Sequence, residues 1–202
     1  MTDIDLDAEF QASALRFRVD SRDKLSDRYG VPLKARFRVP GASLGIARIE
    51  TSDSLYQPSE GGLGAIIIIT GLIAGGGHED LLAFCPAEPD KWYLRKGVAR
   101  WLGEWELGRR LVTVPTHIEP PALASPCRSD DPLHIYSNPL EWLRNACDGA
   151  VPLIPKAYGD LTSAQSTLTF ESPAHMAMAK KLMQRPVQLP EMALRTRADV
   201  AA

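Results

Sequence analysis

The stretch from residue 61 to 77, GGLGAIIIITGLIAGGG, constrains the fold of this chain more than any other part of the sequence. Its four consecutive isoleucines, Ile66 to Ile69, leave no polar alternation, which predicts a strand buried on both faces. Isoleucine branches at Cβ and is favoured on a pleated surface. The glycines on either side indicate turns or close approaches of the backbone. We therefore expect a core strand over residues 65–70.

Three more specific interpretations of this stretch are disfavoured. The continuous apolar part, Leu63 to Ala74, is shorter than the roughly 20 residues that cross a bilayer. It lacks the Gly-Lys-Ser/Thr of a phosphate-binding loop, and its glycines do not have the G-x-G-x-x-G spacing of a dinucleotide site. A ligand-lining loop at Gly75 to Gly77 remains an alternative to a simple turn.

Length, charge and cysteine content describe an ordinary globular chain. The 202 residues suit one domain, and the formal net charge of −2 gives no overall attraction to nucleic acid or to an anionic membrane. The acidic start has no apolar region typical of a secretory signal, so we expect a cytoplasmic protein with no membrane partner. Cys85, Cys127 and Cys147 show no C-x-x-C spacing, which favours reduced thiols over a disulfide framework or a zinc ribbon.

The N-terminal part predicts little regular structure. Residues 1–31 are interpreted as a mobile acidic leader followed by a basic segment, with residues 10–19 open between a short helix and a strand, and 20–30 between a loop and a frayed helix. Residues 32–185 are expected to form a single domain, and 186–202 a loose tail.

Alternating and apolar segments predict further strands. Leu33 to Val39 alternates apolar residues with Lys34, Arg36 and Arg38, and Gly45 to Thr51 alternates again after a Pro-Gly turn, which suggests a hairpin. Asp80 to Phe84 is a further short apolar segment, and further strands are expected at 92–95, 110–114, 133–136, 150–154 and 166–170. A short helix is expected from Val98 to Leu102, with Gly103 ending it.

Two helices in the C-terminal half carry clear start signals. Asn138 is a good N-cap, Pro139 suits the first helical position, and Glu141 lies three residues after the cap. Ser172 and Pro173 predict a second helix by the same logic, running to about Gln184. The fold class is therefore expected to be α+β: one domain with a mainly antiparallel sheet, which could close into a barrel, and two short capped helices in the C-terminal half.

Two blocks carry a family resemblance. DLLAFCPAEPDKWYLRKGVARWLG at 80–103 and PLHIYSNPLEWLRNACDGAVPL at 132–153 resemble uncharacterised bacterial proteins encoded in prophages and other mobile elements of proteobacteria. The resemblance covers under half of the chain and carries no assigned catalytic residue. It implies a mobile-element context without implying a mechanism.

Candidate sites for metal or thiol chemistry are sparse. His78, Glu79, Asp80 and His117 are the residues that could assemble a metal site, which would need three or four converging ligands, although solvated loop residues are the commoner interpretation. Cys127 lies near acidic residues and His134 and is the one plausible reactive thiol, whereas Cys147 is expected to be an inert core thiol. No cofactor is expected.

Two basic regions are the most suggestive features for function. Residues 16–38 contain eight Lys or Arg against three Asp, and residues 91–110 contain six against two Glu. Cations line phosphates and exposed aromatic rings stack on unpaired bases. The predicted nucleic-acid-binding residues are Lys34, Arg36, Arg38, Lys91, Trp92, Tyr93, Arg95, Lys96 and Arg100. The alternative is a solvated cationic face with the aromatic rings in the core.

Three function hypotheses follow. The first is a non-enzymatic accessory protein of a phage or mobile element that binds single-stranded nucleic acid through these residues. The second is a protein-interaction or assembly module, which could be a homo-oligomer, with Trp92, Tyr93 or Trp105 as anchors. The third, and least favoured, is a metal-dependent enzyme.

Overall fold

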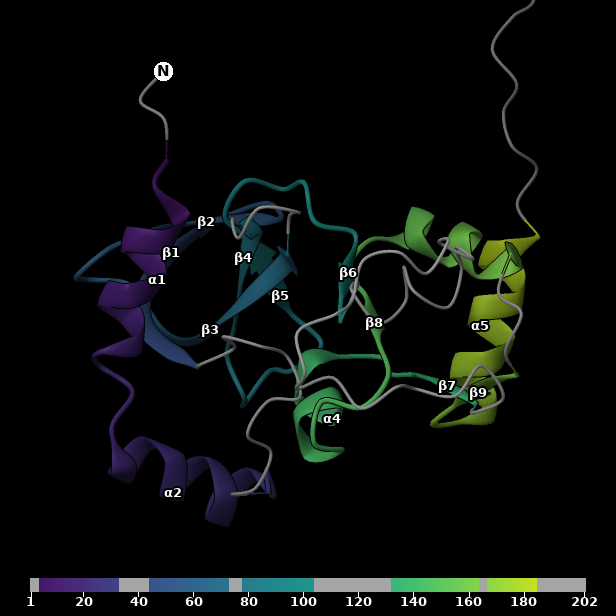
Figure 1. The fold of residues 1–202 in the computed structure, drawn as a ribbon, viewed down its shortest axis with the longest axis horizontal. Helices are drawn as coiled ribbons and strands as arrows, with labels where there is room; N and C mark the ends of the chain where they lie inside the picture. Colours follow the sequence, from purple (N-terminus) through teal and green to yellow (C-terminus); the bar gives the residue numbers. More distant parts are fainter. Residues whose placement is uncertain (1–3, 33–43, 73–77, 104–131, 164–166, 185–202) are drawn as a thin grey trace, which may run out of the picture.

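The computed structural model describes residues 4–32, 44–72, 78–103, 132–163 and 167–184. Within these ranges two N-terminal helices precede a run of strands, and helices alternate with strands only in the C-terminal half (Figure 1). In chain order the elements are α1 (Leu6–Ala14), α2 (Val19–Tyr29), β1 (Gly45–Ser52), β2 (Leu55–Pro58), β3 (Leu63–Leu72), β4 (His78–Phe84), β5 (Trp92–Leu94), β6 (Trp101–Leu102), β7 (Leu133–Ile135), α4 (Pro139–Arg144), β8 (Val151–Pro152), the 3₁₀ helix η1 (Pro155–Ser163), β9 (Leu168–Phe170) and α5 (Pro173–Met183).

Five strands close into a barrel in the order β1-β2-β5-β4-β3. Every neighbouring pair is antiparallel except β2 and β5, which run parallel and meet at the single pair Leu55 and Leu94. The α+β fold class is confirmed, with a mainly antiparallel sheet that closes and with helices α4 and α5 in the C-terminal half.

The predicted buried strand is β3, which lies in the barrel wall between β1 and β4. All six residues from 65 to 70 are buried, as continuous apolar character requires. Ile66 and Ile68 belong to one hydrophobic cluster, which includes residues of α2, α4 and β8, whereas Ile67 and Ile69 belong to another, which includes residues of α1. The isoleucine run therefore separates two cores, and each isoleucine contributes to the core on its own side.

Helix α1 corrects the expectation of a mobile acidic leader over its first residues. Asp5 caps the helix by accepting from the Ala8 N–H, and Leu6 and Phe10, which lie four residues apart on one face, are buried in the second cluster. The close fit to β1 requires glycine, because a Cβ on Gly45 would lie 2.0 Å from the Ser13 Oγ. Asp7 is exposed in the first turn, whereas Glu9 is largely buried against Arg95, so the acidic character of this stretch concealed the helix in the sequence.

Helix α2 resolves the alternative between a loop and a frayed helix. It ends at Gly30, which has φ of 70° and donates to the Leu25 and Ser26 carbonyl groups. Leu25 is the one buried residue of the helix. Because the other positions are mostly polar and partly or fully exposed, the sequence shows no apolar stripe that would predict this helix. Figure 1 shows α1 along one side of the barrel, α2 across its lower end and the C-terminal half on the opposite side.

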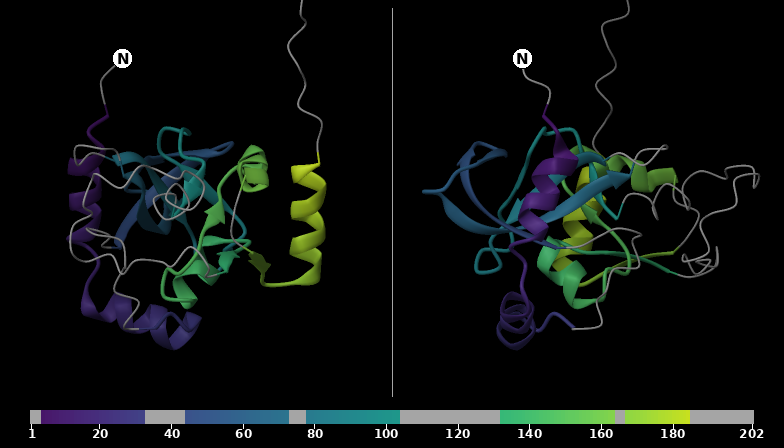
Figure 2. Two further views of the ribbon diagram at one scale, coloured as in Figure 1. Left: turned by 45° about the vertical axis from the view of Figure 1, so that its right-hand side comes forward. Right: turned by 60° about the vertical axis from the view of Figure 1, so that its left-hand side comes forward.

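The C-terminal half adds two small sheets to the barrel. Strand β6 pairs with β8 in antiparallel orientation, and β7 pairs with β9 in parallel orientation. Both predicted helix starts are confirmed: Asn138 accepts from the Glu141 N–H and Ser172 accepts from the His175 N–H. In the left view of Figure 2, α5 lies at the margin of the molecule.

The helix expected from Val98 to Leu102 is wrong. Trp101 and Leu102 form strand β6, and Val98 and Ala99 belong to the loop between β5 and β6. Trp101 and Leu102 are both fully buried, each in a different hydrophobic cluster. Both of these adjacent positions are therefore apolar, and this contributed to an apolar spacing that resembles a helix.

Several expectations lie outside the described residues. They are the strands at 33–39 and 110–114, the loop at 75–77 and the tail at 186–202. Among the described residues no helix is long and apolar enough to cross a membrane.

Candidate binding surface

The buried carboxylate of Asp80, on β4, binds the backbone of the loop between β5 and β6. Its side chain is fully buried, and Oδ1 accepts from the backbone N–H groups of Leu81 at 2.9 Å and Lys96 at 2.7 Å. Oδ2 accepts from Val98 at 2.8 Å and Ala99 at 3.3 Å. A charged acceptor makes stronger hydrogen bonds than a neutral one, and the low dielectric inside the protein strengthens them further. Asp80 therefore clamps the loop that follows β5.

The clamped loop presents apolar side chains to solvent. Val98 is 49% exposed although its own N–H group and those of Lys96 and Ala99 bond to Asp80. Gly97 has φ of 75°, and a Cβ there would lie 2.9 Å from Leu55 Cδ2. Leu55, at the start of β2, is itself 41% exposed. We call Leu55, Lys96, Gly97 and Val98 the clamped-loop surface.

An ion pair behind this surface ties it to α1. Arg95 Nε lies 2.8 Å from Glu9 Oε2, and both side chains are about four-fifths buried, with 19% and 20% of their area exposed. The Tyr56 hydroxyl donates to the same carboxylate, and the Arg95 guanidinium lies over the Tyr56 ring, 6.0 Å from its centre. Burial, and then the nearby Glu9 charge, raise the pKa of Tyr56, so the phenol remains a donor. Polar contacts thus fix the base of the clamped loop.

Most cations of the predicted nucleic-acid-binding segment already have acidic partners. Lys91 pairs with Glu88 at 2.7 Å, Arg95 with Glu9, and Arg100 with Asp160 at 2.7 Å. The Glu88 hydrogen bond raises the pKa of Lys91. Among the predicted cations of this segment, Lys96 is the exposed one without an ion pair in the described part of the chain, and it lies on the clamped-loop surface.

The two aromatic residues of the same segment face opposite cores. Trp92 packs against the cluster that contains α4 and donates its indole N–H to the Leu153 carbonyl at 3.1 Å. Tyr93 packs against the cluster that contains α1. Both side chains are half-buried. The structure therefore does not bring Trp92 and Tyr93 together on one face.

Two of the three cations of α2, Lys24 and Arg28, lie four residues apart on one side of the helix, and Arg22 lies away from them. Asp20, Asp23 and Asp27 lie three and four residues apart on the exposed side of the helix, so this side is acidic. Lys24 and Arg28 lie on a flank beside the buried Leu25. Lys34, Arg36 and Arg38 lie outside the described residues.

The turn between α1 and α2 carries a smaller basic feature. Arg16 and Arg18 are exposed there, beside Leu15, which is 83% exposed, and Val19, which is 60% exposed. No ion pair joins either arginine to an acid within the described residues.

Asp80 and Glu79, two of the predicted metal ligands, do not converge on a common site. Asp80 uses both oxygens to bind backbone N–H groups, and Glu79, its neighbour on β4, points to the opposite face of that strand. No group of three metal-ligating side chains occurs in the described part of the chain. His117 lies outside it, as does Cys127. Cys147 is buried in the core, as expected, and Cys85 is half-buried.

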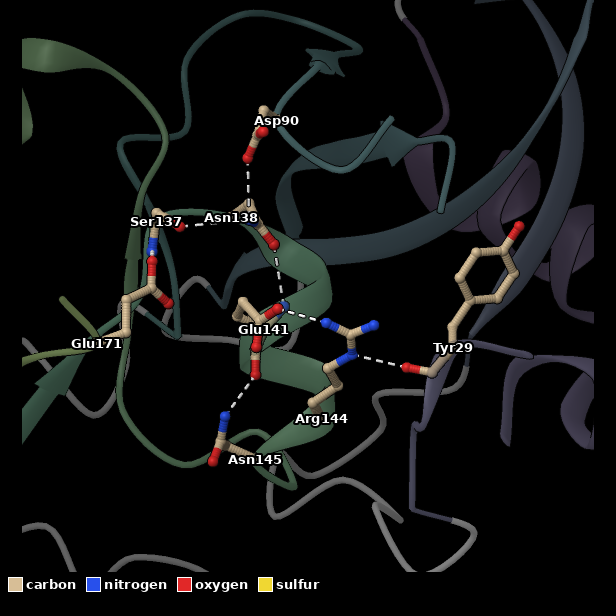
Figure 3. Close-up of polar contacts among 8 residues, drawn as sticks. All are labelled: Tyr29, Asp90, Ser137, Asn138, Glu141, Arg144, Asn145 and Glu171. Atoms are coloured by element: carbon tan, nitrogen blue, oxygen red, sulfur yellow. Dashed lines mark hydrogen bonds and ion pairs between the residues drawn. The ribbon is translucent and has the colours of Figure 1, made fainter. Parts of the chain in front are cut away.

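The two blocks that carry the family resemblance meet in space. Asn138 Nδ2 donates to Asp90 Oδ1 at 3.0 Å, so the cap of α4 also holds the turn before β5 (Figure 3). Arg144, at the end of α4, pairs with Glu141 and donates to the Tyr29 carbonyl at 2.7 Å. This network connects three segments distant in sequence and has a structural role.

Sequence reasoning missed the role of Asp80. The available signal was an aspartate at the start of a fully apolar strand, DLLAF, followed by a glycine-containing loop. A buried charge of this kind requires several donors. Comparisons of the chain with protein-family models, with curated proteins and with solved structures find no match.

Proposed function

We propose that this protein is a non-enzymatic binding module that contacts a protein partner through the clamped-loop surface. The observation that carries the proposal is the set of hydrogen bonds from Asp80, which holds an exposed valine in a fixed position. A segment that is already rigid loses little conformational entropy on binding, so the clamped loop is favoured as a contact surface.

The chemistry of the surface defines the partner. Leu55 and Val98 offer adjoining apolar contacts, and Lys96 adds a positive charge without an ion pair in the described part of the chain. A complementary segment would bury one or two apolar side chains and place an acidic residue beside Lys96. We therefore propose an acidic, apolar peptide segment as the recognised element.

Selection from a peptide library tests this proposal. A displayed library of random peptides is selected on the wild-type protein, and the enriched peptides are then tested for binding to Val98→Asp and Lys96→Glu. Enrichment of peptides that combine apolar and acidic residues, and that lose binding in Lys96→Glu, supports the proposal. The proposal fails if every enriched peptide binds Val98→Asp as well as it binds the wild-type protein.

Nucleic-acid binding is a second candidate, favoured by the exposed Arg16 and Arg18, which form no ion pair within the described residues. The resemblance to mobile-element proteins is compatible with it. Fluorescence anisotropy with labelled single- and double-stranded oligonucleotides across a salt series tests it. Binding that weakens with salt, and that is reduced in Arg16→Ala/Arg18→Ala or in Lys34→Ala/Arg36→Ala/Arg38→Ala but not in the control Lys180→Ala/Lys181→Ala, supports it. Absence of binding at low salt excludes it.

A further inference from the structure

A buried histidine lies where α5 docks onto the rest of the molecule. His175, in the first turn of α5, is 6% exposed, and its Nε2 lies 2.8 Å from the Tyr158 hydroxyl of η1. Its Nδ1 lies 3.5 Å from Glu171 Oε1 and makes no hydrogen bond. The imidazole contacts the rings of Tyr158 and Phe170 edge to face.

These neighbours suit a neutral imidazole. The Tyr158 hydroxyl donates to Nε2, and the ring proton then lies on Nδ1, which is 3.5 Å from Glu171 Oε1. This tautomer is assigned from the neighbours of the ring. Glu171 is itself held by the Ser137 N–H at 3.0 Å.

Protonation of the imidazole at Nε2 reverses the direction of its hydrogen bond with Tyr158. Nε2 would become a donor, the Tyr158 oxygen would accept from it, and the phenolic hydrogen would lack an acceptor among the described residues. The phenol keeps this hydrogen, because burial and then Glu171 raise the pKa of Tyr158 to about 12. A buried donor without a partner is costly, and so is a buried charge.

Few titratable groups face the imidazole. Tyr158 faces it from η1, Glu171 faces it from the turn after β9, and β9 contributes the uncharged Phe170. Lys180 and Lys181 are exposed in the last turn of α5. Desolvation lowers the pKa of His175 and outweighs the opposing effect of Glu171.

We propose that α5 is held by a pH-sensitive latch, in which protonation of His175 releases the helix from η1 and β9. Release removes Ala179, Leu182 and Met183 from their hydrophobic cluster and uncovers its other members. Because the docked state lowers the pKa of His175 below its ordinary value of 6.5, docking is strongest above that pH and weakens progressively below it. The latch is independent of the clamped-loop surface.

Hydrogen exchange of the α5 amides measures how firmly the helix is docked at each pH. Protection factors, corrected for the intrinsic pH dependence of exchange, are compared between pH 7.5 and pH 5.0, with the amides of β3 and β4 as internal reference. In the wild-type protein α5 protection is expected to be lower at pH 5.0 than at pH 7.5, while β3 and β4 keep theirs.

Two variants keep the proposal falsifiable. His175→Gln retains an acceptor for Tyr158 but does not titrate, so its α5 protection is expected not to change with pH, whereas the matched control His134→Gln keeps the wild-type fall. Glu171→Gln removes the opposing charge and is expected to increase the fall, which provides a test if His175→Gln does not fold. Equal α5 protection at both pH values, or an equal fall in His175→Gln, would overturn the proposal, as would an equal loss of protection in β3 and β4.

Discussion

The conformation of the loop that follows β5 depends on a single side chain, that of Asp80. Four backbone N–H groups converge on its carboxylate, which is fully buried in the barrel. A carboxylate can satisfy four donors with two oxygens, and no neutral side chain of this size can do so. The loop from Lys96 to Ala99 therefore depends on this one side chain for its conformation.

Replacement of Asp80 by asparagine tests this dependence. In Asp80→Asn an amide N–H₂ faces backbone donors in place of an oxygen, so the free energy of unfolding is expected to fall by about 3 kcal/mol. Urea denaturation measures the loss. The matched control is Asp53→Asn, since Asp53 is exposed and has φ of 53°, which asparagine tolerates. Similar stability of the two variants would contradict the account.

Among the helices and strands, N-cap residues set where the C-terminal helices begin, and packing contacts set where α1 lies on the barrel. Asn138 and Ser172 both begin helices, and both were visible in the sequence because capping depends on local residue types. The start of helix α1 was not predicted, and residues 10–19 were open between a helix and a strand, because its burial rests mainly on Leu6 and Phe10 together with the distant Gly45. Contacts of this kind are set by the tertiary structure and leave little periodicity in the sequence.

The two caps are expected to differ in their contribution. Asn138→Ala removes the cap of α4 together with the hydrogen bond to Asp90, so its cost is expected to exceed that of Ser172→Ala, which is about 1 kcal/mol. Chemical denaturation of both variants gives the comparison. In an Asp90→Ala background the excess should disappear, and persistence of the excess there would argue against the contact between the two blocks.

The ion pair between Glu9 and Arg95 is expected to hold α1 on the barrel. A double-mutant cycle with Glu9→Gln and Arg95→Gln should give a coupling free energy of about 1 kcal/mol, because the pair is partly buried. The coupling should decrease at high salt. A coupling energy of zero would show that the packing of Leu6 and Phe10 alone docks the helix.

At the scale of the whole molecule, one hydrophobic cluster joins the barrel to the C-terminal half. Ile68, Phe84 and Leu94 of the barrel share it with Trp142 and Leu143 of α4. The sequence predicted the central strand, the fold class and both C-terminal helices, since each rests on local pattern. It could not predict the closure order of the strands, the parallel pairs or the partners of the cations, because these depend on which distant segments meet.

This shared core predicts cooperative unfolding of the two halves. Leu143→Ala, at a fully buried position, is expected to cost about 3 kcal/mol and to reduce the exchange protection of β3 and β4 as well as that of α4. Hydrogen exchange of the variant measures both. Loss of protection confined to the C-terminal half would contradict a common core.

Val98 is the residue through which we propose that the clamped-loop surface binds a peptide segment. Calorimetric titration of one peptide selected on the wild-type protein, carried out on the wild-type protein, Val98→Asp and Leu63→Asp, tests it most directly. Leu63 is the matched control, because it is 65% exposed and lies at the start of β3, outside the clamped-loop surface. The account predicts at least about a tenfold loss of affinity in Val98→Asp, the loss expected for an interface anchor, and none in Leu63→Asp. Equal affinities in all three proteins would contradict it.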